Sequence, residues 1–269
     1  MMRLCLFGTS HLAALRMAYR AEPDRWPEFE ITFVGATGAK LLDHVINDGV
    51  MTPTSPELQR NFQLMAGVKA LDLRQFDAFA LSGCQIGPHM IGHIYGQARW
   101  LGLPSLQKTG IPPNPHWSLM SETAIDAVLQ HRIMHSIAGV LSPQLSGALE
   151  KPVLVASSPR PDETLMTLQK HKLIAQKRAV RQGDAAHLSD RYDGLAWDCF
   201  RSSGVDYLPQ PPHTIKDHML TRSIYMEGAV KLTPRGVFAQ PDNDIMHGNA
   251  AYGAAVLDQI TVALSDVEE

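Results

Sequence analysis

The chain has 269 residues, of which 45% are hydrophobic, 19% charged and 7% aromatic, and its 24 Lys and Arg nearly balance its 27 Asp and Glu, for a net charge of -3. This composition excludes a disordered, collagen-like or coiled-coil chain, and the length allows one large domain or two small ones with a real core. The charge balance predicts no general attraction to nucleic acid or to an anionic membrane surface.

Cysteine usage and the first residues bear on the compartment. The three cysteines, Cys5, Cys84 and Cys199, cannot all pair internally, and their spacing matches no zinc or redox motif. We interpret them as free thiols in a reducing compartment. The N-terminal segment contains only the short apolar run LCLF, and no stretch approaches the roughly 20 apolar residues of a membrane span. We therefore expect a cytoplasmic protein with no membrane contact.

Short apolar runs, each followed by a polar or Gly-rich break, recur along the chain. Five of them predict β-strands, at residues 3–7, 30–34, 77–82, 152–156 and 205–208. Helical patterns separate several of these runs, and strands that alternate with helices favour a parallel sheet covered on both faces. We therefore predict an α/β fold of three layers with a five-stranded, mainly parallel sheet.

The helical patterns vary in length and in how they end. A long one, over residues 125–141 with apolar side chains in steps of four, predicts a helix that Pro143 should stop or break. A helical insertion is expected at about residues 160–204, and the last helix follows His247. Neither an internal repeat nor a low-complexity linker interrupts the sequence, so we predict a single domain over residues 1–269.

The segment Gly8-Thr9-Ser10-His11 comes directly after the first predicted strand. In a parallel sheet with right-handed crossovers, such loops lie at one edge, and ligands bind outside that edge. A Ser at this turn lies beside the unpaired N–H groups and the positive dipole end of the next helix, which can stabilise the oxyanion of ester attack. Two alternatives are that Ser10 only caps the helix, or that the helix start binds a phosphate.

A second polar segment, DNDIMHGN at residues 242–249, precedes the last helix. A nucleophilic Ser needs a base, and that base needs an orienting carboxylate. Asp244 and His247 stand three residues apart, a spacing that lets both side chains turn to one side. The alternative is a solvated loop in which Asn249 caps the last helix.

Taken together, the two segments resemble the sequence blocks of the SGNH/GDSL-type hydrolases, a superfamily of Ser esterases, lipases and carbohydrate deacetylases. Gly8-Thr9-Ser10 is similar to the family's Gly-x-Ser block after the first strand, and Asp244-Ile245-Met246-His247 is similar to its Asp-x-x-His block near the C-terminus. The resemblance spans nearly the whole chain through the order and spacing of these blocks. It departs at Thr9, where the family usually has Asp.

The resemblance implies the flavodoxin-like SGNH hydrolase fold and a catalytic triad of Ser10, His247 and Asp244. It also implies an oxyanion hole that includes the N–H of Gly38, with Gly35 as second choice. A further donor would be the side-chain amide of Gln85, which stands where the family has Asn. The alternatives are ordinary turn glycines and an exposed surface Gln. The resemblance implies no metal and no organic cofactor.

The implied activity is hydrolysis of a carboxylic ester. We expect removal of an acetyl or other short acyl group from a carbohydrate or small-molecule ester, and the same residues would also serve transfer of the acyl group to a glycan. Two competing classes are a non-catalytic binding protein on the same fold and a flavodoxin-like protein that binds a nucleotide phosphate at the turn of residues 8–11. The sequence predicts no oligomeric state.

Other polar residues support weaker hypotheses. His11 is interpreted as a helix-surface residue, with tuning of Ser10 as the alternative. The basic run over residues 170–181 predicts a solvated helix face, with a docking surface for an anionic glycan or partner as the alternative. His131 and His135 share a helix face but have no acidic third ligand nearby, so we expect no metal site.

Overall fold

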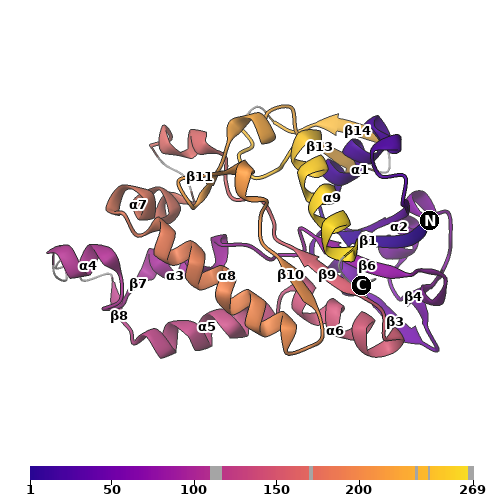
Figure 1. The fold of residues 1–269 in the computed structure, drawn as a ribbon, viewed down its shortest axis with the longest axis horizontal. Helices are drawn as coiled ribbons and strands as arrows, with labels where there is room; N and C mark the ends of the chain where they lie inside the picture. The colour runs from indigo at the N-terminus through magenta and orange to yellow at the C-terminus, as the bar shows by residue number, and fades with distance from the viewer. Residues whose placement is uncertain (110–116, 170–171, 234–235, 242, 266–269) are drawn as a thin grey trace.

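A five-stranded parallel sheet forms the centre of the fold in the computed structural model (Figure 1). Its strands are β1 (Met2–Gly8), β2 (Phe29–Gly35), β6 (Ala78–Ser82), β9 (Val153–Ala156) and β10 (Asp206–Leu208), in the spatial order β10-β9-β6-β1-β2. Every neighbouring pair is parallel. Numbered along the chain, this is the 2-1-3-4-5 order of a flavodoxin-like, doubly wound sheet. The predicted α/β class and the five parallel strands are confirmed.

The structure describes residues 1–109, 117–169, 172–233, 236–241 and 243–265. Its helices are α1 (Leu12–Ala21), α2 (Pro56–Met65), α3 (His89–Gln97), α4 (Pro104–Thr109), α5 (Glu122–Met134), α6 (Ile137–Leu149), α7 (Ile174–Gln182), α8 (Ala185–Arg201) and α9 (Ala250–Ser265). Of the basic run expected in the insertion, Lys170 and His171 lie outside the described residues. Within these ranges, none of the helices combines the length and the apolar character that a membrane crossing requires.

Four small sheets accompany the central one. They are β3 (His44–Asn47) with β4 (Val50–Pro53) and β5 (Leu71–Asp72), β7 (Ala98–Arg99) with β8 (Ser118–Leu119), β11 (Ile215–Lys216) with β12 (Leu220–Thr221), and β13 (Val230–Thr233) with β14 (Gly236–Ala239). None of these short strands was predicted from the sequence. They lie in the connections, and the central sheet alone determines where the strand-end loops gather.

Helices cover both faces of the central sheet, and the side chains of β1 show how. Leu4 and Leu6 pack into one apolar cluster with α1 and α9, whereas Cys5 and Phe7 pack into a second cluster with α2, α3, α6 and α8. All four are completely buried. A fully buried Leu or Phe side chain contributes about 1.5–3 kcal/mol of hydrophobic stabilisation. The two clusters are the two interfaces of a three-layer α/β/α arrangement.

The helix expected over residues 125–141 is two helices, α5 and α6. The break falls at Ser136, whose backbone is extended and whose hydroxyl accepts a hydrogen bond from the N–H of Gly139 at 3.0 Å, which caps α6. Pro143 lies inside α6 and does not end it. Because a buried Ser cap at the start of α6 fixes the boundary, the expectation that Pro143 sets it was wrong.

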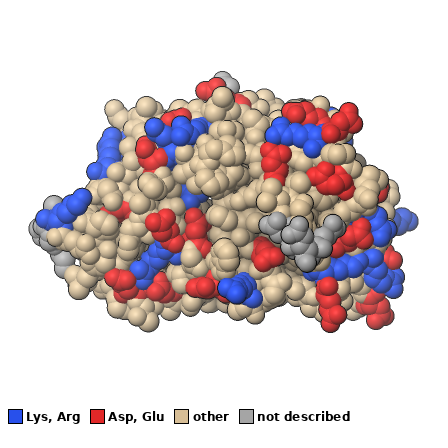
Figure 2. Space-filling model, in the orientation of Figure 1, with Lys and Arg blue, Asp and Glu red and all other residues tan. Residues whose placement is uncertain are grey.

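The predicted helical insertion contains α7 and α8, between β9 and β10. These helices pack against α3 and α5, which come from the connection between β6 and β9. Together they extend to one end of the molecule, beyond the sheet (Figure 1). Lys177, expected on a solvated helix face, is buried and donates to the carbonyl oxygen of Leu168. Over the face shown in Figure 2, acidic and basic side chains are interspersed.

Candidate active site

The topology of the sheet creates a crevice beside the end of β1. From β1 the chain moves to β2 on one side and later to β6 on the other. The loops after β1 and β6 therefore leave the sheet in opposite directions, which is where ligands bind in open α/β sheets. The hydroxyl of Thr9, after β1, donates a hydrogen bond to the carbonyl oxygen of Gly83, after β6. This bond ties the two loops together at the crevice.

Ser10 lies in the turn between β1 and α1, and its side chain is exposed. The N–H of Leu12 donates to the carbonyl oxygen of Thr9 at 3.1 Å, which closes the turn before the helix begins. His11, not Ser10, occupies the N-cap position, and no side chain caps this helix. The alternative that Ser10 serves only as a helix cap is therefore not supported. In the described part of the chain, the N–H of Ser10 donates to no protein group.

Three side chains from opposite ends of the chain are joined by hydrogen bonds. Ser10 Oγ lies 2.9 Å from His247 Nε2, and His247 Nδ1 lies 2.7 Å from Asp244 Oδ2. With its proton on Nδ1, the imidazole donates to the carboxylate and accepts from the Ser hydroxyl. The side chains of His247 and Asp244 are 21% and 13% exposed, so the imidazole is shielded but accessible. The arrangement can take a proton from a hydroxyl and return it to a leaving group.

The loop that carries Asp244 and His247 is held from several sides. The second oxygen of Asp244 accepts the N–H of Met246 at 3.0 Å. The carbonyl oxygen of Ile245 accepts the N–H of Asp162, from the loop after β9, at 2.8 Å. Asn249 accepts the N–H of Tyr252 at 3.1 Å and thereby caps α9. These bonds fix the carboxylate and the imidazole before any ligand binds.

His11 contacts the triad imidazole directly. Its ring stacks on that of His247, with centroids 4.9 Å apart and an interplanar angle of 28°. Its Nδ1 atom is buried and has no hydrogen-bond partner in the described structure. Burial, followed by the nearby His247 and His89, lowers the pKa of His11 to about 3. The interpretation of His11 as a helix-surface residue was wrong, because the residue turns inward at the start of α1 as a neutral ring.

Gly38 and Gln85 lie in loops on either side of Ser10. Gly38 follows β2, has a φ of +55°, and begins a short 3-10 helix, Gly38–Leu42. Gln85 follows β6, is exposed, and has a φ of +61°. No hydrogen bond of the described chain involves the N–H of Gly38 or the side-chain amide of Gln85. Both groups are therefore available as donors at the crevice, although no contact joins either of them to Ser10. Gly35 is the last residue of β2, beside Gly8.

Two further imidazoles near the site escaped the sequence reasoning. His89 is the first residue of α3 and is half-buried, and its ring lies 5.9 Å from that of His93, one turn along the helix. Burial, followed by His93 and Arg132, lowers the pKa of His89 to about 4. The only available sequence signal was the i, i+4 spacing of the two histidines.

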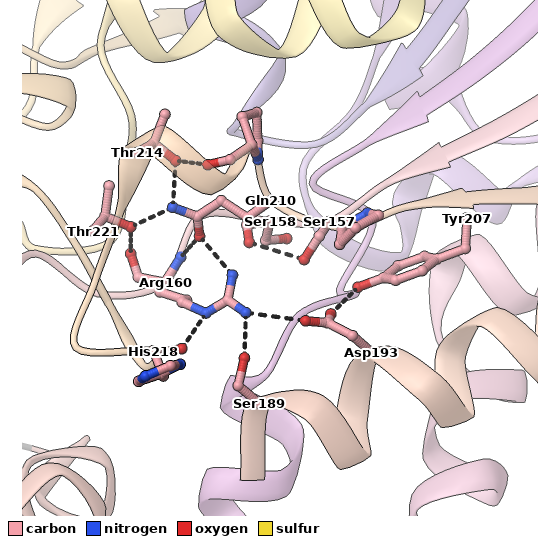
Figure 3. A network of polar contacts seen from close by, with 12 residues as sticks. Ser157, Ser158, Arg160, Ser189, Asp193, Tyr207, Gln210, Thr214, His218 and Thr221 are labelled. Carbon is pink, nitrogen blue, oxygen red and sulfur yellow. Dashed lines mark hydrogen bonds and ion pairs between the residues drawn. The ribbon is translucent and has the colours of Figure 1, made fainter. Parts of the chain in front are cut away.

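A buried polar network holds the loops after β9 and β10 (Figure 3). Arg160, with 2% of its surface exposed, donates to Ser189 at 2.6 Å and to Asp193 at 3.1 Å on α8. It also donates to the carbonyl oxygen of His218 at 2.7 Å and to the amide oxygen of Gln210. The guanidinium thus links α8 to the connection that precedes the triad loop. Its donors point into protein, so its role is to hold the scaffold.

Among the residues that the structure describes, no group of three or more His, Cys, Asp or Glu side chains is arranged to hold a metal ion.

Comparison with known proteins identified no family for this chain. A scan against protein-family models, a search of curated proteins and a search of solved structures each gave no match. The functional argument therefore depends on the geometry of the site.

Proposed function

We propose that the protein is a serine-dependent carboxylic-ester hydrolase of the SGNH type. The observation that carries the proposal is the hydrogen-bonded series Ser10–His247–Asp244, whose two distances are 2.9 and 2.7 Å. The series lies at the switch point of the sheet, and the hydroxyl of its Ser10 is exposed. A Ser, an imidazole and a carboxylate in this order form the unit that activates a hydroxyl for attack on an acyl carbon.

The proposed reaction has two halves. Ser10 Oγ attacks the ester carbonyl carbon while its proton moves to His247 Nε2, and Asp244 stabilises the imidazolium that forms. The negative oxygen of the tetrahedral intermediate accepts hydrogen bonds from the N–H groups of Ser10 and Gly38 and from the amide of Gln85. His247 then protonates the departing alcohol. Water, activated by the same imidazole, releases the acyl group from Ser10.

The low pKa of His11 supports this assignment. At neutral pH a group with a pKa of about 3 is uncharged, so the ring stacked on His247 adds no positive charge that would oppose its protonation. A carbohydrate or small-molecule ester with a short acyl group is the proposed substrate, as the resemblance to the SGNH/GDSL-type hydrolases implies. Transfer of the acyl group to a glycan differs only in the second half, where a hydroxyl of the glycan attacks the acyl group in place of water.

The test combines covalent labelling with turnover. A fluorophosphonate probe followed by peptide mass analysis is expected to modify Ser10, and 4-nitrophenyl acetate is expected to release nitrophenol. In Ser10→Ala, labelling should vanish and kcat should fall by up to roughly 10⁶. Ser265→Ala is the matched control, because this exposed Ser lies at the end of α9 and bonds only to its own helix.

Two results would decide against hydrolysis. No labelling at Ser10, with Ser10→Ala equal to the parent protein in every ester assay, would leave a binding protein on the same fold. Recovery of an acetylated sugar in place of free acetate, when a sugar alcohol is supplied, would assign the enzyme to acyl transfer.

A further inference from the structure

Beyond the triad, a row of imidazole side chains extends from the turn of Ser10 along α3. His89, the first residue of α3, is near enough to help lower the pKa of His11, and its ring lies 5.9 Å from that of His93. One helical turn, about 5.4 Å, separates these two positions along the helix axis. His93 is exposed, whereas His89 is half-buried. The row of imidazoles therefore leads from the turn of the catalytic Ser to an exposed position on α3.

Two exposed cations flank the outer end of this row. Arg132 belongs to α5 and Lys172 stands two residues before the start of α7, and both helices pack against α3. Desolvation, then the positive charges of Arg132 and Lys172, lower the pKa of His93. Arg132 also lowers the pKa of His89. The packing agrees with this placement, because a Cβ added at Gly92, next to His93, would lie 2.6 Å from the side chain of Gln176 in the first turn of α7, and α5 also packs against α3.

The two cations have no counter-ion within the described parts of the chain. The carboxylates of α5, Glu122 and Asp126, stand ten and six residues before Arg132, beyond the spacing at which side chains of one helix pair, and they bind Arg191 at 2.9 and 2.8 Å. Neither Arg132 nor Lys172 makes a hydrogen bond or an ion pair with any described residue. The positive charge is local, since the whole chain carries a net charge of -3.

We propose that the substrate is an ester of an anionic alcohol, an acidic sugar or a sugar phosphate, whose carboxylate or phosphate is bound by His93, Arg132 and Lys172. The inference rests on the proposed hydrolase function. The planar guanidinium of Arg matches a carboxylate or phosphate with two parallel hydrogen bonds, and Lys adds a point charge. His93 lies one helical turn beyond His89 on α3, which places the anion on a part of the substrate remote from the ester that Ser10 attacks.

The test uses three O-acetylated methyl glycosides that differ in one group: a neutral glucoside, the corresponding glucuronide, and the 6-phosphate. We expect kcat/KM for at least one of the anionic esters to exceed that for the neutral one by about tenfold, because the two exposed cations, Arg132 and Lys172, each contribute a modest attraction. The preference should fall at high salt. The ranking of glucuronide and phosphate identifies which anion is bound.

Variants distinguish specific binding of the anion by Arg132 and Lys172 from a general effect of the protein's net charge. In the double variant Arg132→Gln and Lys172→Gln, the ratio of kcat/KM for anionic over neutral ester should fall toward one. The matched control is Lys69→Gln with Arg201→Gln, which removes the same two charges from exposed positions before β5 and at the end of α8. The control should keep the preference of the parent protein.

The outcomes distinguish the two proposals. Labelling of Ser10 with equal kcat/KM for all three esters would overturn the anionic substrate and leave the hydrolase in place. A preference that survives in the Arg132 and Lys172 variant would also overturn it. Absence of Ser10 labelling and of any ester turnover would instead remove the hydrolase, and the inference with it.

Discussion

Gly83 is the position where a single added methyl group should disturb the site most. Its φ is +65°, and an added Cβ would lie 2.4 Å from the Cβ and 2.6 Å from the Cδ2 of His11. The nearest atom is adjacent to the backbone of His11, so it cannot move aside easily. His11 in turn stacks on His247. The change Gly83→Ala should therefore destabilise the fold and shift the triad imidazole.

The magnitude follows from two terms. An Ala in the left-handed region costs roughly 1–2 kcal/mol, and forcing an extra carbon into a packed site typically costs about 1–3 kcal/mol. The free energy of unfolding should then fall by about 2–5 kcal/mol, which lowers the Tm of a protein of this size by about 5–15 °C. Ester turnover should fall with it, because the imidazole loses its stacked position.

Thermal unfolding and initial rates on 4-nitrophenyl acetate measure both effects. Gly194→Ala is the matched control, because Gly194 is exposed inside α8 and an added Cβ would meet nothing within 4 Å. This change should raise the free energy of unfolding by about 0.5–1 kcal/mol. If Gly83→Ala had the Tm and the turnover of the parent protein, the packing of His11 against Gly83 would be refuted.

Three further predictions concern neighbouring groups. The folded-state pKa values of His11 and His89, about 3 and 4, lie below the unfolded value of 6.5, so the unfolded chain binds more protons and stability is lost as pH falls from 6.5 toward 4. Each residue should contribute up to about 1.4 kcal/mol per pH unit, and a urea unfolding midpoint that is the same at pH 7 and pH 5 would contradict this. Asp244→Asn should lower kcat on 4-nitrophenyl acetate by up to about 10⁴ through the wrong imidazole tautomer, and a loss below tenfold would argue against its orienting role. Arg160→Met should destabilise the fold by about 3 kcal/mol, because it leaves Asp193 without its cation, and urea denaturation should detect that loss while a change near zero would contradict it.

The central sheet was predictable because its strands are apolar on both faces. Residues 3–7 contain four consecutive side chains that are fully buried, and Gly8 follows where the chain must turn. The hairpin of β3 and β4 was missed although its sequence carried a signal. Asp48-Gly49 separates the two strands, and both residues have positive φ, as the two-residue hairpin turn requires. The position of Pro143 was a misleading signal, because a Ser cap seven residues earlier decides the helix boundary.

The candidate site was likewise only partly predictable from the sequence. Ser10 and His247 could be placed near one sheet edge from local signals, since each stands in a polar segment at the border of a strand or a helix. The groups around these two residues could not be placed from local signals. His89, Arg132 and Lys172 lie 43 and 40 residues apart along the chain, and only the packing of α3 against α5 and α7 brings them together. His11 was misjudged because its ring packs inward against Gly83, whose missing side chain leaves room for it, and the sequence does not show this contact.

The pairing of the first helix with the last one has a consequence for synthesis on the ribosome. Translation at about 5–20 residues per second makes Ser10 well before His247, which follows 237 residues later. Throughout that interval the apolar side of α1 lacks α9, against which Leu12 and Leu15 are finally buried. A nascent chain therefore exposes these apolar residues of α1 to chaperones until α9 has been made, and the hydroxyl of Ser10 has no imidazole partner before His247 is added.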